Sequence, residues 1–338
     1  MSEKTLRICH LYPDLLNLYG DRGNILCMRR RLEWRGIDAE VTEVTVGEQA
    51  DFTQFDLFFI GGGQDFEQEV LLSDLKAGKG SEIKAAIADG KTFLTICGGY
   101  QMLGSYYRTW DGKQCDFIGA IDYYTVGSKE RMIGNFLFEC LPESGGSTVV
   151  GFENHSGKTY LGSGVSPLGK VLVGGGNNGE DGFEGVRYHN VFGTYSHGPV
   201  LPKNPAFCDH LLTTALQQRY PNLELQPLDD AAELAAHNTM RDRLLKKSLH
   251  GKWAHPSGCA HRASHIKNPA GSECPRAGSC PRKSPLPARL PSPARPLAAD
   301  PRAWRAFRST ARVCISAAGP PCSGRPRAWR ACARPARR

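Results

Sequence analysis

A single cysteine stands where an apolar segment of the sequence meets a pair of glycines. The apolar residues 92–96 are followed directly by Cys97, Gly98 and Gly99. This order is typical of a nucleophile elbow, a sharp strand-to-helix turn whose small neighbours let one side chain stand above a sheet edge. At a helix N-terminus, unpaired N–H groups and the helix dipole favour the thiolate, which is the attacking form. The alternative is a buried cysteine that acts as a small hydrophobe in a core strand.

Two other segments supply what a thiol nucleophile needs. The apolar run 55–60 ends in the glycines 61–63, bare backbone whose amides can face an oxyanion. We expect the N–H groups of Gly63 and Gly98 to hold that charge. His197 ends a later apolar run and can accept and donate a proton. These segments favour the nucleophile over the buried hydrophobe.

The motifs together resemble the class I glutamine amidotransferases, and more closely their cobyric-acid-synthase-like branch. Cys97, Gly99 and Gln101 form Cys-x-Gly-x-Gln, and residues 194–198 read Thr-Tyr-Ser-His-Gly. Within that branch, several segments look like the glutaminase subunit of lipid II isoglutaminyl synthase, namely residues 11–24, 61–65, 131–135 and 151–157. Several separated motifs make a chance match improbable, and the resemblance runs from about Leu6 to about Leu249.

The resemblance implies hydrolysis of glutamine through a cysteine thioester. Cys97 would attack the side-chain carbonyl, and His197 would give a proton to the leaving ammonia and then activate water. Triad amidotransferases carry a glutamate two positions after the histidine, where this chain has Pro199. The expectation is therefore a Cys97/His197 dyad whose imidazole is oriented by another group, with Glu184 and Asp209 as candidates.

Two further residues match substrate-binding positions of the resembled subunit. Arg131 matches the residue that holds the α-carboxylate of glutamine, which a guanidinium can bind through two hydrogen bonds. Gln101 is placed to hydrogen-bond the bound glutamine. Their alternatives are an exposed surface arginine and an ordinary residue of a first helical turn. We interpret His10, His155 and His189 as structural histidines.

No P-loop or other nucleotide motif occurs in residues 1–250, so an ATP-dependent ligase must be another chain. The resemblance implies a heterodimer with a Mur-ligase-like subunit that carries ATP and Mg²⁺ and converts the D-glutamate of lipid II to D-isoglutamine in peptidoglycan. We expect no cofactor or metal in this chain. Two alternatives stay open: a glutaminase for another acceptor, such as a cobyrinic-acid-type corrin, and a non-catalytic binding module with a vestigial elbow.

The charge divides the sequence into two unlike parts. Residues 251–338 hold 18 Lys and Arg but only 2 acidic residues, together with 14 of the 22 prolines. This composition predicts a basic disordered tail that follows one glutaminase domain over residues 1–250. The domain itself is acidic, which argues against a nucleic-acid partner. The sequence lacks an apolar leader, a membrane-length apolar run and any Cys-x-x-Cys pair, and these absences predict a cytoplasmic chain without a zinc site.

Strands and helices are expected to alternate along the first part of the domain and to position these residues. Expected strands are 6–10, 39–44, 55–60 and 92–96, and expected helices are 25–34, 66–75 and 81–88. This alternation predicts a three-layer α/β sandwich with a largely parallel sheet, whose carboxyl edge carries both the glycine run and Cys97. The glycine-rich segment 117–195 predicts an antiparallel annex.

Two helices are expected to close the domain. Asn204 and Pro205 predict an N-cap and a first-turn proline, and Asp230 with Glu233 predicts a capping box before the last helix. We interpret these helix residues as core and cap, with an exposed stripe of Met240, Leu244 and Leu245 as an alternative partner surface.

Overall fold

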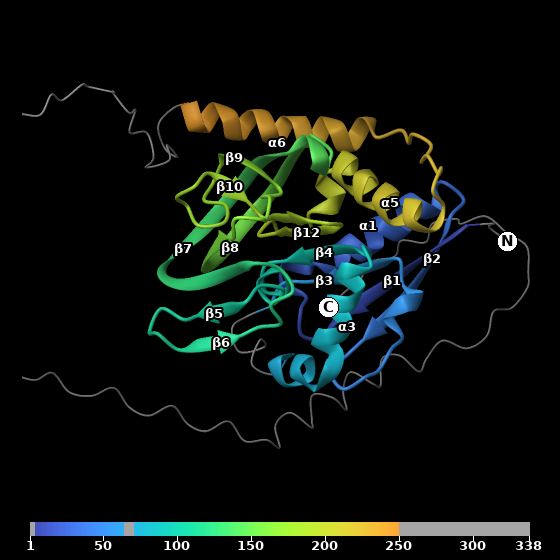
Figure 1. Ribbon diagram of the computed structural model, residues 1–338. Coiled ribbons are helices and arrows are strands. Elements are labelled where there is room, and N and C mark those ends of the chain that lie inside the picture. Colours follow the sequence, from blue (N-terminus) through green and yellow to red (C-terminus); the bar gives the residue numbers. More distant parts are fainter. Residues whose placement is uncertain (1–3, 64–70, 250–338) are drawn as a thin grey trace, which may run out of the picture. The chain divides into compact units, whose positions relative to one another are not determined.

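A six-stranded sheet, ordered β11-β12-β4-β3-β1-β2, runs through the computed structural model, which describes residues 4–63 and 71–249 (Figure 1). Its strands are β1 (Thr5–Leu11), β2 (Asp38–Val44), β3 (Leu57–Ile60), β4 (Thr92–Ile96), β11 (Val186–Tyr188) and β12 (Val191–Thr194). Only β11 pairs antiparallel with its neighbour. Every residue of β3, β4 and β12 is buried, as continuous apolar strands of a covered parallel sheet should be. These three strands end at the same edge.

Helices cover both faces of this sheet. They are α1 (Arg22–Glu33), α3 (Gly80–Ala88), the short α4 (Gly98–Gln101) and α5 (Pro205–Arg219), whereas α6 (Ala231–Leu249) contacts strands of a second sheet. Helices α1 and α5 contact each other on one face, and α3 lies on the other (Figure 1). The predicted three-layer sandwich with a largely parallel sheet is confirmed. The first half of the helix predicted over 66–75, and the tail predicted over 251–338, lie outside the described residues.

The predicted annex is a sheet of its own. It contains β5 (Tyr106–Arg108), β6 (Gln114–Asp116), β7 (Tyr123–Cys140), β8 (Thr148–Leu161), β9 (Gly169–Val173) and β10 (Phe183–Glu184). The long β7–β8 ribbon dominates it, and only the β5–β7 pair is parallel. The last strands of the predicted annex, β11 and β12, belong instead to the central sheet. Residues 194–198 therefore leave the central sheet beside β4.

Asn204 precedes Pro205 as predicted, but its side chain does not cap α5. Its amide instead binds the backbone of β8, accepting from Val150 N–H at 2.8 Å and donating to the Val150 carbonyl at 2.9 Å. The amide also donates to the Val200 carbonyl. Asn204 is thus the N-cap residue of α5, as predicted, but its amide hydrogen-bonds the buried strand β8 and not the N–H groups of the helix start.

The predicted capping box at α6 is wrong. Both carboxylate oxygens of Asp230 accept from the Arg31 guanidinium of α1, at 2.6 and 2.8 Å, and these hydrogen bonds hold the pKa of Asp230 below its usual range. Arg31 also makes two bonds of 2.7 Å to Asp209 of α5. The Arg31 side chain is only 4% exposed, so it is a buried cation that ties α1 to α5 and to the start of α6.

The apolar stripe of α6 is core. Leu244 is 4% exposed and packs with Leu137, Val150 and Val173 of the second sheet, and Met240 and Leu245 pack against the same cluster. The proposed partner surface on this stripe is therefore covered by the domain itself. In the described ranges, no helix combines the length and apolar character that crossing a bilayer would require.

Arg31→Met should lower the free energy of unfolding by about 3 kcal/mol, because it leaves the largely buried Asp230 carboxylate without its hydrogen-bonded cation and leaves Asp209 with Arg35 alone. Arg30→Met is the matched control, since Arg30 pairs with Glu33 on the surface, where both side chains are more than half exposed. Urea unfolding followed by circular dichroism measures both variants. Equal, small losses in the two variants would show that the Arg31 cluster does not support the fold.

Candidate active site

Cys97 occupies a strained turn between β4 and α4. Its φ of 48° and ψ of −106° lie in a region that non-glycine residues rarely adopt, and such strain is often found at functional sites. The Cys97 N–H donates to the Thr194 carbonyl at 2.9 Å, which ties the turn to β12. A Cβ at Gly99 would lie 2.7 Å from the Gly61 carbonyl oxygen, so only glycine fits there. The thiol is held at the carboxyl edge of the sheet.

Gly62 lies at the point where three side chains converge. A Cβ on Gly62 would lie 2.6 Å from His197 Cε1, 3.2 Å from Asp21 Oδ2 and 3.3 Å from Cys97 Cβ. No larger residue fits without displacing one of them. The turns after β3, β4 and β12 and the start of α1 therefore meet at one glycine.

His197 is buried beside Asp21. The Nδ1 of His197 lies 3.7 Å from Asp21 Oδ2, and neither side chain has exposed surface. The same Asp21 oxygen accepts from Gly62 N–H at 2.7 Å, and the His197 N–H donates to the Phe152 carbonyl at 2.8 Å. Burial by itself lowers the pKa of His197, but the thiolate charge of Cys97 and the contact with Asp21 outweigh it and raise the pKa to about 10. These surroundings therefore favour the charged form of the imidazole.

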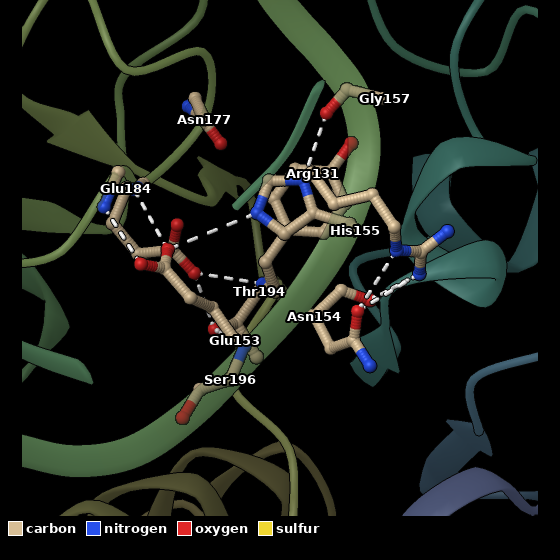
Figure 2. A network of polar contacts seen from close by, with 12 residues as sticks. Arg131, Glu153, Asn154, His155, Gly157, Asn177, Glu184, Thr194 and Ser196 are labelled. Atoms are coloured by element: carbon tan, nitrogen blue, oxygen red, sulfur yellow. Dashed lines mark hydrogen bonds and ion pairs between the residues drawn. The ribbon is translucent and has the colours of Figure 1, made fainter. Parts of the chain in front are cut away.

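Asp21 is the group that sequence reasoning missed. Neither candidate named from the sequence reaches His197. Glu184 accepts instead from Thr194 Oγ1 at 2.6 Å and from Tyr195 N–H at 2.7 Å (Figure 2), and burial raises the pKa of its carboxyl to about 8. Asp209 accepts from Arg31 of α1 and from Arg35, which follows that helix. Asp21 lies inside the motif over residues 11–24, but nothing in that motif marks which carboxylate faces a histidine far along the chain.

A cavity of about 460 Å³ opens beside Cys97. Its wall is formed by Leu18, Tyr19, Gly63, Cys97, Gln101, Tyr107, Arg131, Asn154, His155, Ser156 and Gly157. It brings together four residues that the sequence analysis singled out: Cys97, Gln101, Gly63 and Arg131. A larger hollow of about 800 Å³ beside α1 contains none of these four residues, nor His197 or Asp21, so the smaller cavity is the candidate site.

The two predicted substrate-binding side chains come from opposite sides of this cavity. Gln101, at the end of α4, is 5% exposed and donates to the Tyr195 hydroxyl at 3.1 Å. Arg131 is exposed on β7, and the Asn154 carboxamide accepts from its guanidinium at 2.9 and 3.0 Å (Figure 2). The cavity therefore has a cation on the side of the second sheet and a thiol on the side of the central sheet.

His155 forms part of the cavity wall. Its ring stacks on Tyr195 with centroids 3.6 Å apart, and Nδ1 lies 2.8 Å from the Gly157 carbonyl oxygen (Figure 2). Its Nε2 lies 3.8 Å from Glu153 Oε2, which accepts from Gly176 N–H, and Glu153 Oε1 accepts from Gly175 N–H. These contacts fit the structural interpretation of this histidine.

Known proteins share this sequence pattern. A sequence model of the CobB/CobQ-like glutamine amidotransferase domain matches residues 7–205. The GatD subunit of lipid II isoglutaminyl synthase (glutamine-hydrolyzing) from Staphylococcus aureus is 43% identical over 238 residues, which are 70% of this chain and 96% of that protein. The GatD subunit from Streptococcus pneumoniae is 42% identical, over 67% of this chain and 86% of that protein. A cobyric acid synthase from Clostridium botulinum is 29% identical, over 61% of this chain and 44% of that protein.

These matches confirm the resemblance found in the motifs, and the geometry around Gly62 joins the residues that carry it. The chain is a glutamine amidotransferase subunit and belongs to the CobB/CobQ-like glutamine amidotransferase family.

Proposed function

We propose that this chain is the glutaminase subunit of a lipid II isoglutaminyl synthase. It hydrolyses L-glutamine to glutamate and ammonia, and the ammonia serves to amidate the D-glutamate of lipid II to D-isoglutamine. The observation that carries the catalytic part is the convergence of Cys97, His197 and Asp21 on Gly62 beside the cavity. The two GatD subunits, matched over most of their length, support the acceptor.

The first half of the reaction breaks the amide bond. Cys97 Sγ attacks the side-chain carbonyl carbon of glutamine, and the charge moves to the carbonyl oxygen. The N–H groups of Gly62 and Gly99 are engaged by Asp21 and by the Gly61 carbonyl, so we assign the oxyanion to their neighbours Gly63 and Gly98. Each such donor is typically worth about 3 kcal/mol in the transition state. The His197 imidazolium gives its proton to the leaving nitrogen, and ammonia departs.

The second half frees the enzyme. The neutral imidazole of His197 takes a proton from water, the hydroxide adds to the γ-glutamyl thioester, and Cys97 leaves as thiolate with release of glutamate. Asp21 stabilises the imidazolium present before and after each cycle. The raised pKa of His197 supports a proton on the imidazole that is available to the leaving nitrogen. Arg131 binds the α-carboxylate of glutamine, and Gln101 hydrogen-bonds the substrate.

The ligase step belongs to a partner. The sequence of the domain offers no nucleotide motif, so we infer a heterodimer with a Mur-ligase-like subunit that binds ATP, Mg²⁺ and lipid II in the cytoplasm. A corrin acceptor has weaker support, because the matched cobyric acid synthase is less similar and this chain spans under half of it. The intact Cys97, His197 and Asp21 argue against a vestigial site.

Cys97→Ser should abolish glutamine hydrolysis, because a serine hydroxyl has no accessible ionised form to attack the amide. The fold and the complex with the ligase should persist, so amidation should continue when ammonium is supplied. Cys115→Ser, at a half-buried cysteine outside the cavity, is the control. Ammonia release near the wild-type rate from the Cys97 variant would rule out this nucleophile.

Asp21→Asn should slow glutamine hydrolysis by roughly 10²-fold and change its pH dependence. In the wild type, the imidazolium persists until the pH rises through about 10. Removal of the Asp21 charge lowers the pKa of His197, so the alkaline limb of kcat/KM should move to lower pH. The same substitution at the exposed Asp14 should leave the profile unchanged. An Asp21→Asn profile with an unmoved alkaline limb would mean that Asp21 does not act on His197.

Arg131→Ala should lower kcat/KM for glutamine by about 2 kcal/mol, the scale of a lost charge-assisted contact, mainly through KM. Arg131→Lys should recover part of the loss. Ammonium bypasses the glutamine site, so both variants should still support ammonium-driven amidation in the complex. Parallel loss of ammonium-driven and glutamine-driven amidation would move Arg131 to the partner interface or to the fold.

A further inference from the structure

Arg131 is carried by an irregular part of the second sheet. Gly127 pairs with Gly157 and Met132 pairs with His155, so residues 128–131 of β7 stand opposite Ser156 alone. Strand pairing is interrupted across such a bulge, and the side chain is exposed. Its orientation must therefore come from side-chain contacts.

Asn154 supplies those contacts. Its Oδ1 accepts from Arg131 Nε at 3.0 Å and from Nη2 at 2.9 Å, and its backbone carbonyl accepts from Nη2 at 3.3 Å (Figure 2). No carboxylate in the described ranges pairs with Arg131. The guanidinium is thus fixed by a neutral carboxamide, which leaves its positive charge available to an anionic ligand in the cavity.

Tyr19, which also lines the cavity, supports Asn154. The Asn154 Nδ2 donates to the Tyr19 hydroxyl, and the Tyr19 ring lies edge-on to His197 with centroids 4.9 Å apart. Tyr19 has a φ of 54°, a conformation that a tyrosine adopts at a cost, yet 46% of its surface is exposed. Core packing therefore does not explain why the residue is held in this conformation. Its contacts with Asn154, Phe152 and His197 do.

We propose that Asn154 and Tyr19 are positioning residues for glutamine recognition. Asn154 aims the Arg131 guanidinium into the cavity, and Tyr19 holds the Asn154 amide while its ring covers His197. The inference rests on the proposed role of Arg131 as the holder of the α-carboxylate. The proposal links the α-carboxylate subsite to the His197 imidazole through a continuous set of contacts. It also explains why residue 154 is neutral, because an aspartate there would itself pair with the Arg131 guanidinium.

The first test is steady-state glutamine hydrolysis by the complex with its ligase. Asn154→Ala should raise KM for glutamine about tenfold with kcat nearly unchanged, as expected for loss of a hydrogen bond to a charged group. Asn154→Asp should raise KM further, because the new carboxylate neutralises Arg131. Tyr19→Phe should give a smaller increase. Asn135→Ala, the same change at an exposed asparagine of β7, should leave KM unchanged. A lower KM for Asn154→Asp than for Asn154→Ala would overturn the proposal.

The second test measures alkylation of Cys97 by two reagents. A diazoketone analogue of glutamine carries the α-carboxylate, and iodoacetamide does not. Asn154→Ala should slow only the analogue, by about tenfold, and should slow it no further in an Arg131→Ala background. An equal effect on both reagents would make Asn154 a support of the thiol, and additive effects with Arg131→Ala would make it independent of Arg131; either result overturns the proposal.

The same assay separates this inference from the proposed function on which it rests. If Arg131→Ala reacts with the analogue at the wild-type rate, the role of Arg131 itself fails. If Arg131→Ala reacts slowly and both Asn154→Ala and Tyr19→Phe react normally, only the present inference fails. Tyr19→Phe and Asn154→Asp change few atoms, so they keep the test valid if Asn154→Ala does not fold.

Discussion

The absence of a side chain at Gly62 is the constraint on which the site depends. The turn after β3 passes so close to Asp21, Cys97 and His197 that a single methyl group would contact all three side chains. This close approach lets the Gly62 N–H bind Asp21 while the imidazole remains beside the thiol. A parallel sheet makes the arrangement possible, because β3, β4 and β12 bring their carboxyl ends to one edge.

The residues of the candidate site come from both sheets. Cys97 and His197 follow strands of the central sheet and Asp21 stands at the start of α1; all three are buried, where electrostatic interactions are strong. The second sheet supplies Arg131 and Asn154, which lie at the more open side of the cavity. Tyr19 joins the two parts, since it contacts both His197 and Asn154 and stands two residues before Asp21 in the chain.

The sequence predicted the fold class and brought Cys97, Gln101, Gly63 and Arg131 forward as one site, because strand ends and short motifs are local signals. The predictions from the sequence failed for polar side chains that can hydrogen-bond either a nearby or a distant group. Asn204 and Asp230 have the residue types of helix caps, yet Asn204 binds β8 and Asp230 binds Arg31 of α1. Asp21 was missed for the same reason: its partner His197 is distant in the sequence, and only the tertiary structure shows which carboxylate reaches the imidazole.

The covalent intermediate is the most direct test of this account. The complex should be quenched with acid during steady glutamine turnover, digested and examined by mass spectrometry. The account predicts a γ-glutamyl adduct on the peptide that contains Cys97, absent when glutamine is withheld. An adduct on a different cysteine, such as Cys27 or Cys115, would contradict it. A wholly unmodified Cys97 peptide during ammonia release would also contradict it, above all in the Asp21→Asn variant, where the thioester should accumulate.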